Sequence, residues 1–277
     1  MSVYVGEEAK VYYVTETTYG ETPTSPTMYG MTTAPHVEPG LNPGLIKVRG
    51  IGSRDLQAIK KGLRRVELKV AYALPSDTPI DFLQHIQALT SLSVEVFYEK
   101  TSGIIDLLHK GCRFNRVTVE CSAEDIIKAE AELIGQNVAV GTAKVGATYN
   151  DHSGAVAFHE SYVKKGVATL DRVTDYRFVI ENNLRRVPVI RTTNGFLLKY
   201  LQERQRNCMG ELTFEFEDKE EYDDVINDTE FTLEFGLGGT KKAVFSNCKW
   251  ENVATPTRVE DLVGLRAPFA AKSVVIS

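Results

Sequence analysis

Alternating apolar and polar residues recur along the chain and predict a protein made mostly of β-strands. Within residues 62–74, Val66, Leu68 and Val70 alternate with charged side chains. Successive side chains of a strand point to opposite faces, so this period indicates a strand with one buried face. The same pattern recurs in residues 92–96, 211–217 and 229–235.

Two short stretches depart from this period, and each predicts one helix. In residues 77–86, Asp77 is a suitable N-terminal cap and Pro79 suits the first turn. Residues 218–226 begin with acidic side chains, which the dipole at a helix N-terminus favours. The chain is therefore expected to hold one short helix in each half.

An internal repeat organises these elements. Shifted by 136 positions, residues 112–140 align without a gap on residues 248–276, and Cys112 meets Cys248. The alignment holds six identities in 29 positions. A repeat of this kind fixes the architecture before any local motif does. The chain is predicted to contain two tandem copies of one β-rich module.

The repeat also decides one ambiguous segment. Residues 126–134 have fair helix propensity, but charged and apolar side chains alternate along them. The aligned segment of the second copy contains Pro268, which is poorly tolerated inside a helix. Residues 126–134 are therefore predicted to be a strand.

The predicted organisation has four parts. Residues 46–141 form the first module and residues 176–277 the second. Residues 1–45 are rich in turn formers and predict a polar N-terminal arm, either a flexible tail or an ordered arm on a neighbouring subunit. Residues 142–175 are predicted to be a long connecting loop, and loops of this length are usually functional or flexible.

Composition is that of a soluble globular protein, with 43% hydrophobic and 25% charged residues. No apolar run approaches the roughly 18 residues of a transmembrane helix, and the first residues do not resemble a signal peptide. The net charge of −5 argues against non-specific affinity for DNA. The cysteines lack compact ligand spacing and are expected to be reduced core or interface thiols: Cys112, Cys121, Cys208 and Cys248.

No catalytic group, metal site or cofactor is predicted. The five histidines are dispersed, and none has metal spacing or a nucleophile nearby. The glycine-rich residues 236–242 lack the spacing of a phosphate-binding loop and join two predicted strands, so they are expected to be a hairpin turn. Basic residues gather at 60–65, where a subunit contact or a solvated strand end is expected.

Acidic side chains occupy the polar positions of the strands in the second module. They are predicted to make one face of two strands strongly acidic, with weaker counterparts in the first module. Taken alone, such a face is typical of a solvated outer sheet surface. The residues are Glu211, Glu215, Glu217, Glu230 and Glu234, with Glu67 and Glu95 as the counterparts.

The order of elements resembles the tail-tube fold of long-tailed bacteriophages, which is shared with the tube of contractile injection systems. Residues 13–23 resemble the start of many such tail proteins, and residues 178–184 and 260–263 resemble later segments. The resemblance implies two tandem β-sandwich or barrel modules of the tube type. It implies subunits whose sheets join edge to edge into rings, with rings stacked into a hollow tube, and it carries no catalytic residues.

In such a tube one sheet face lines the lumen, and an acidic lining would repel passing DNA near the wall. The resemblance thus makes Glu67, Glu95, Glu211, Glu215, Glu217, Glu230 and Glu234 the lumen-lining candidates. Tubes of this kind commonly close six modules, so a two-module chain is expected to form trimeric rings with pseudo-six-fold symmetry. The expected partners are further copies, other tail proteins and DNA that passes without specific binding. Insertion into a membrane is not expected. The expected location is the virion tail, after assembly in the host cytoplasm.

Three alternatives remain open from sequence. A tail hub or terminator with the same fold would form a single ring and would not polymerise. A monomeric β-sandwich that binds carbohydrate or protein would expose aromatic platforms, whereas the lone tryptophan, Trp250, aligns with Phe114 and is expected in the core. An enzyme ranks third, because no acid, base, nucleophile or metal group converges.

Overall fold

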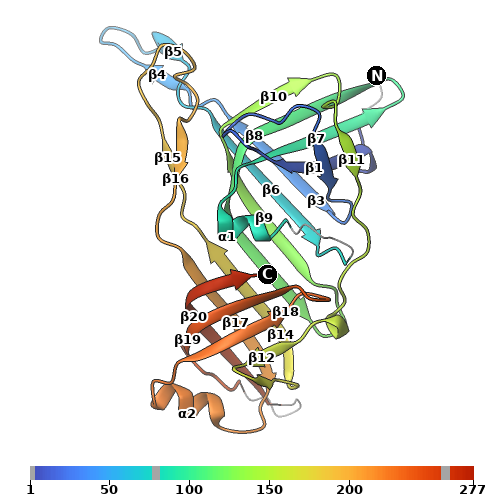
Figure 1. The fold of residues 1–277 in the computed structure, drawn as a ribbon. Helices are drawn as coiled ribbons and strands as arrows, with labels where there is room; N and C mark the ends of the chain where they lie inside the picture. The colour runs from blue at the N-terminus through green and yellow to red at the C-terminus, as the bar shows by residue number, and fades with distance from the viewer. Residues whose placement is uncertain (1–3, 77–81, 257–262) are drawn as a thin grey trace.

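A computed structural model describes residues 4–76, 82–256 and 263–277. One 16-stranded sheet runs through almost the whole molecule, and two small two-stranded sheets project from it (Figure 1). The described helices are α1 (Gln84–Ala88) and α2 (Glu220–Ile226), with single 3-10 turns at η1 (Gly6–Glu8) and η2 (Phe158–Glu160). The prediction of a mainly β protein with two short helices is confirmed. Asp77, Pro79 and the pair Glu260 and Asp261, which the sequence singled out, lie outside the described residues.

The strands divide into two sets that we name the first and the second strand set. In the first set the hydrogen-bonded order is β2-β1-β7-β8-β9-β6-β3. Its strands are β1 (Ala9–Thr15), β2 (Thr27–Gly30), β3 (His36–Asn42), β6 (Arg65–Ala73), β7 (Leu92–Lys100), β8 (Gly103–Ser122) and β9 (Lys128–Gly135). Strand β10 (Asn137–Gly141) continues β9 along β8, and β11 (Thr148–Asn150) pairs with β2.

The second set repeats this order as β13-β12-β18-β19-β20-β17-β14. Its strands are β12 (Val163–Lys165), β13 (Ala168–Thr169), β14 (Val173–Glu181), β17 (Asn207–Glu215), β18 (Phe231–Gly236), β19 (Lys242–Trp250) and β20 (Gly264–Ile276). Each helix precedes the equivalent strand, α1 before β7 and α2 before β18. Each set also carries one inserted hairpin, β4 (Ile46–Val48) with β5 (Ala58–Lys60) and β15 (Arg185–Val187) with β16 (Tyr200–Gln202).

The two sets agree in register as well as in order. Gly111 and Asn247, 136 positions apart, both adopt positive φ, at 64° and 52°, and both stand beside a register shift in the pairing. Glycine and asparagine tolerate this left-handed conformation, which a β-bulge requires. The equivalent cross-strand pairs are Leu92–Cys112 and Phe231–Cys248, Val94–His109 and Leu233–Phe245, Phe114–Leu133 and Trp250–Phe269, and Val70–Ala131 and Leu212–Ala267.

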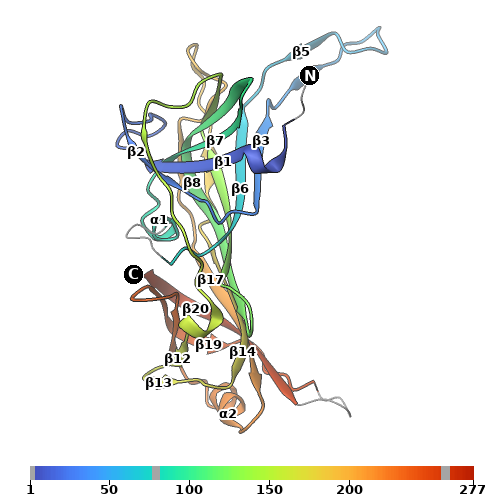
Figure 2. The ribbon, with the colours of Figure 1, turned by 90° about the vertical axis from the view of Figure 1, so that its right-hand side faces the viewer.

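Strand β8 joins the two sets. Its first half pairs with β7 and β10, and its second half pairs with β9 on one side and with β14 of the second set on the other. The sheet is therefore continuous from the first set to the second, as the rotated view shows (Figure 2). One connected group of buried side chains fills both sets, from Val11 to Ile276.

The predicted N-terminal arm is instead part of the sheet. Strand β1 pairs along its whole length with β7, and β3 pairs with β6. Val11, Tyr12, Tyr13 and Val14 are all buried, because both faces of β1 are covered. Many of the turn-forming residues on which the arm prediction rested connect these short strands, whereas Pro39, Gly40 and Asn42 lie within β3 itself.

Strand β8 is one continuous strand of 20 residues that bends at Gly111. One further difference concerns a predicted loop. The expected loop at residues 142–175 contains β11, β12, β13 and the start of β14. Strands of two or three residues are too short to show a period in the sequence.

Gly111→Ala should destabilise the protein by about 1–3 kcal/mol, because alanine is strained at positive φ. Its Cβ would also lie 2.8 Å from Cβ of Gln136. The matched control is Gly146→Ala, where no atom lies within 4 Å of the added Cβ. Urea unfolding would measure both, and equal stability of the two variants would contradict the role of this bulge.

Candidate functional site: the open sheet face and its edges

One face of the continuous sheet is a polar surface, which we call the open face. It is formed by alternate residues of β3, β6, β9, the second half of β8, β14, β17 and β20, whose other residues point into the core. On β6, for example, Val66, Leu68 and Val70 are buried whereas Glu67 and Lys69 are exposed. The period-two pattern of the sequence thus specifies this face directly.

Charges of both signs share the open face. Its acidic residues include Glu38, Glu67, Glu120, Glu130, Glu132, Asp175, Glu181, Glu211 and Glu215, and its basic residues include Arg65, Lys69, Arg116, Lys128, Arg177 and Arg266. Several form ion pairs across strands: Arg266–Glu211 at 2.6 Å, Arg116–Glu181 at 3.4 Å and Arg177–Glu120 at 4.0 Å. The face carries a small acidic excess in place of the strongly acidic surface that the sequence predicted.

The lumen-lining candidates do not all share this face. Glu67, Glu211 and Glu215 lie on it, and Glu217 follows the end of β17. Glu230 and Glu234 belong to the β18 region, and β20 and β19 separate β18 from β17. The expected acidic face of two adjacent strands therefore does not form, because alternation gives a strand's faces but not its neighbours.

Glu95 is fully buried, so the prediction that it lines a lumen is wrong for the described subunit. Its carboxylate accepts hydrogen bonds from the Tyr149 hydroxyl at 2.8 Å and the Val145 N–H at 2.7 Å. Burial and the neighbouring Glu95 raise the pKa of Asp106 to about 7. The segment that contains Val145 and Tyr149 covers this acidic pair, and no pattern in the sequence signals that cover.

The second set has a different partner at the same place. By cross-strand pairing, Glu234 is equivalent to Glu95 and Lys242 to Asp106. Lys242 forms an ion pair with Glu234 at 3.2 Å, and the Tyr162 hydroxyl donates to the same carboxylate at 2.7 Å. One site is thus a pair of acids and its equivalent is an acid with a base.

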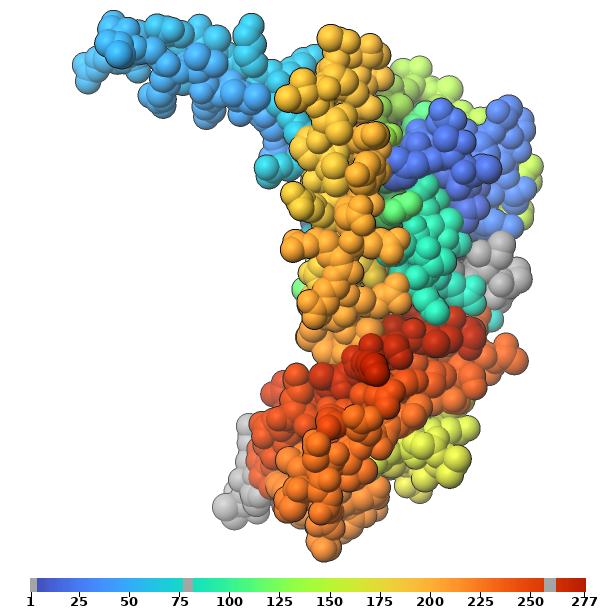
Figure 3. Space-filling view, turned by 60° about the vertical axis from the view of Figure 1, so that its left-hand side comes forward, coloured from blue at the N-terminus to red at the C-terminus, as the bar shows by residue number. Residues whose placement is uncertain are grey.

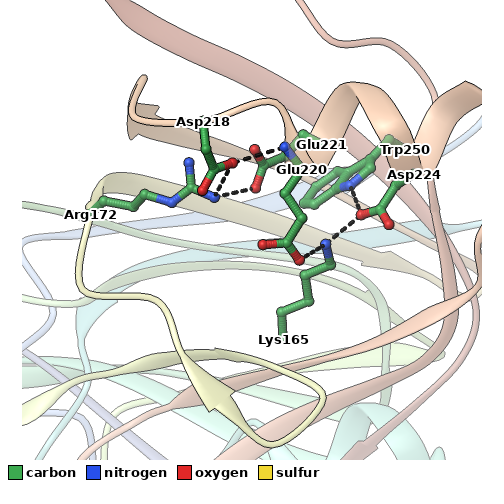
Figure 4. Close-up of polar contacts among 7 residues, drawn as sticks. All are labelled: Lys165, Arg172, Asp218, Glu220, Glu221, Asp224 and Trp250. Atoms are coloured by element: carbon green, nitrogen blue, oxygen red, sulfur yellow. Dashed lines mark hydrogen bonds and ion pairs between the residues drawn. The ribbon is translucent and has the colours of Figure 1, made fainter.

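A network of ion pairs fastens α2 to the second set (Figure 4). Arg172 contacts Glu221 at 2.7 Å, and both side chains are buried. Burial raises the pKa of Glu221 although Arg172 lies beside it. Lys165 pairs with Glu220 at 2.7 Å and also with Asp224, which accepts a hydrogen bond from the Trp250 indole N–H at 3.1 Å. These contacts hold the helix against the second set.

The two inserted hairpins have different surroundings. Hairpin β15–β16 lies along the first strand set, where Leu184, Leu198 and Leu201 pack with Leu89 and Ile134. Hairpin β4–β5 projects away from the body of the molecule (Figure 3). It exposes apolar side chains: Leu45, Ile46, Val48, Ile51 and Ile59. A cluster of this kind marks a contact surface.

Two strand edges complete the surface. Within the described residues, β3 pairs only with β6, which leaves its outer edge open. Residues 252–256 make the single bridge Ala254–Arg266 to β20, and no described strand pairs with their other side. Open edges of this kind are templates for pairing with another chain.

The glycine-rich segment and the cysteines have structural positions. Residues 236–242 form a hairpin turn between β18 and β19, as predicted. The four cysteines are free and buried. No group of three or more metal-ligating side chains occurs within residues 4–76, 82–256 and 263–277. In those same ranges no helix has the length and apolar character needed to cross a membrane.

These features define a β-rich structural protein with surfaces suited to assembly. A family model described as phage tail tube protein matches residues 6–271, which is nearly the whole chain. The chain belongs to the phage tail tube protein family, and is therefore a structural protein of the virion tail. No curated protein is significantly similar in sequence.

Arg172→Ala should destabilise the protein by about 3–5 kcal/mol, because it leaves the Glu221 carboxylate buried without its cation. A double variant, Arg172→Met with Glu221→Gln, should recover much of this loss. The control is Lys219→Ala, which removes an exposed ion pair with Asp223 and should cost under about 1 kcal/mol. Denaturant unfolding tests the prediction, which fails if Arg172→Ala and Lys219→Ala are equally stable.

Stability should depend on pH through Asp106. Its pKa is about 7 in the folded protein and about 4 in an unfolded chain, so the folded state holds this proton more tightly. The resulting stabilisation is complete below about pH 4 and is lost as pH rises through 7. Asp106→Asn should remove this part of the loss between pH 5 and 8 in thermal unfolding followed by circular dichroism. The exposed Asp55→Asn is the control, and identical pH profiles for all three proteins would refute the assignment.

Proposed function

We propose that three copies of this chain close into a ring. Such rings would then stack into the tail tube, around a central channel for DNA. The observation that carries this proposal is the β8–β14 junction. Within one chain, the edge strand of the second set completes the open edge of the first. The edges at β3 and at residues 252–256 are of the same two kinds as β14 and the second half of β8.

Joining these two edges between copies gives a head-to-tail contact. Such a contact is heterologous, and it produces a ring when the rotation closes and a helical filament when it does not. A ring would pair the edge of β3 with that of residues 252–256, which removes the association liability of these two edges.

The number of copies follows from the two strand sets. We infer that the chain carries two copies of one module, which the shared strand order, register and bulge position support. Six modules then need three chains, with three junctions inside chains and three between them. The ring would have pseudo-six-fold symmetry, and the module boundaries would follow the strand sets in place of the sequence-based ranges 46–141 and 176–277.

The open face is the surface we assign to the channel wall. It is polar and free of a basic excess, so DNA phosphates would find no strong attraction there. Glu67, Glu211 and Glu215 are the acidic candidates that lie on this face. DNA would pass without sequence-specific contact, other tail proteins would meet the ends of the tube, and assembly would take place in the host cytoplasm.

Native mass measurement and electron microscopy of the purified protein test this function together. We expect a mass of three chains per ring and filaments of stacked rings with a central hole. Six chains per ring would contradict the two-module arrangement. Single rings that never stack would favour a tail hub or terminator, and a stable monomer at high concentration would refute ring assembly altogether.

A further inference from the structure

The geometry points to a specific subunit interface, which rests on the proposed ring. We infer that β3 of one copy pairs with residues 252–256 of the next, in the register that β14 adopts on β8. Hairpin β4–β5 then lies on the second strand set of that next copy, as β15–β16 lies on the first set of its own chain. The internal junction is the template for the external one.

The register follows from equivalent positions. Strand β3 meets β6 at Val37–Val70, and β14 meets β17 at Tyr176–Leu212, where Val70 and Leu212 are equivalent through their partners Ala131 and Ala267. Residues 252–256 follow β19 as residues 116–120 follow the equivalent part of β8. The internal pairs Glu181–Arg116, Ile180–Val117 and Val179–Thr118 therefore predict the external pairs Asn42–Asn252, Leu41–Val253 and Gly40–Ala254.

Backbone directions agree with this pairing. Ala254 exchanges two hydrogen bonds with Arg266, at 3.0 and 2.8 Å. Because backbone groups alternate in direction along a strand, those of Val253 point away from β20. The equivalent Val117 meets Ile180 of β14 in this way. Val253 therefore offers both its N–H and its C=O to a strand from another copy.

Exposure of the apolar side chains supports the same partner. Ile180 is 1% exposed at the internal junction, whereas its equivalent Leu41 is 52% exposed in the isolated subunit. Val117 is fully buried, and its equivalent Val253 is only half-buried. The external interface would bury the two side chains that lack cover, which is the usual source of stability in an obligate contact.

Pro39 fits an edge that is open in the free subunit. It occupies the position of Phe178 in β14, whose backbone faces β8. A proline costs nothing there until a partner arrives, because its missing N–H points to solvent. At this position the external ladder would lack the hydrogen bond that the N–H of Phe178 can donate at the internal junction.

The hairpin extends the interface beyond the strand. Beside the internal junction, two carbonyl groups of hairpin β15–β16 accept hydrogen bonds from the first set. The Gln136 side chain donates to the Leu198 carbonyl at 2.9 Å, and the Arg64 N–H donates to the Phe196 carbonyl at 2.8 Å. It also buries three leucines on the first set. Hairpin β4–β5 is inserted at the same point of the strand order, exposes its apolar residues and has no comparable cover within the described residues. The second set of the next copy is the surface that the internal arrangement assigns to it.

Engineered cysteines test the register. Asn42 and Asn252 are both exposed, and their equivalents Glu181 and Arg116 are in ion contact at 3.4 Å. They would form a non-hydrogen-bonded pair, whose Cα atoms lie about 4.5 Å apart, within disulfide range. The full-length variant Asn42→Cys with Asn252→Cys should therefore cross-link into dimers and trimers on a non-reducing gel after mild oxidation. The native cysteines are buried and should not interfere.

The matched control moves one cysteine along the edge. Glu38 is exposed and lies on β3 four residues before Asn42, which is about 13 Å along a strand. No cross-link is therefore expected in Glu38→Cys with Asn252→Cys. Rings that form without a cross-link specific to the first variant would overturn this register and leave the proposed function standing. Absence of rings from the unmodified protein by electron microscopy would overturn both.

Discussion

Backbone hydrogen bonding between strands is the constraint on which this molecule depends. Every strand in a sheet needs a partner on both sides or a reason to be left open. Strand β8 meets this need for both sets at once, because its second half holds β9 on one side and β14 on the other. Without that shared strand, β14 would have no strand of the first set to pair with. The same requirement applies to β3 and to residues 252–256, whose outer sides have no strand partner within the described residues.

The core supports this arrangement in different ways in the two sets. In the second set Phe178, Phe235, Phe245 and Phe269 pack with ring centroids 5.1 to 6.0 Å apart. The first set relies more on aliphatic residues and on Phe82 and Phe114, which lie 4.6 Å apart. The two sets therefore fill their cores with different side chains although their backbone pairing is the same. Register is fixed by the pleat and the bulge, so it tolerates such exchange as long as buried positions stay apolar.

Much of the fold could be predicted from the sequence, because local hydrophobic periods and an internal repeat indicate it. The alignment of Cys112 with Cys248 led to two hairpins that do share register, and Pro268 correctly marked a strand. The apolar run at residues 11–14 was a signal of a doubly covered strand, but the turn formers around it obscured that meaning. The short strands β12 and β13 left no readable period. The site was less accessible, since the burial of Glu95 depends on a segment fifty residues away, and the neutralising arginines come from strands that only the topology places nearby.

The 20-residue length of β8 has a mechanical consequence. A force that pulls the two strand sets apart along this strand loads the hydrogen bonds between β8 and β14 all at once. A force applied across it would instead open them one after another. The first geometry resists far greater tension than the second, so the two strand sets are hardest to separate by a pull along β8.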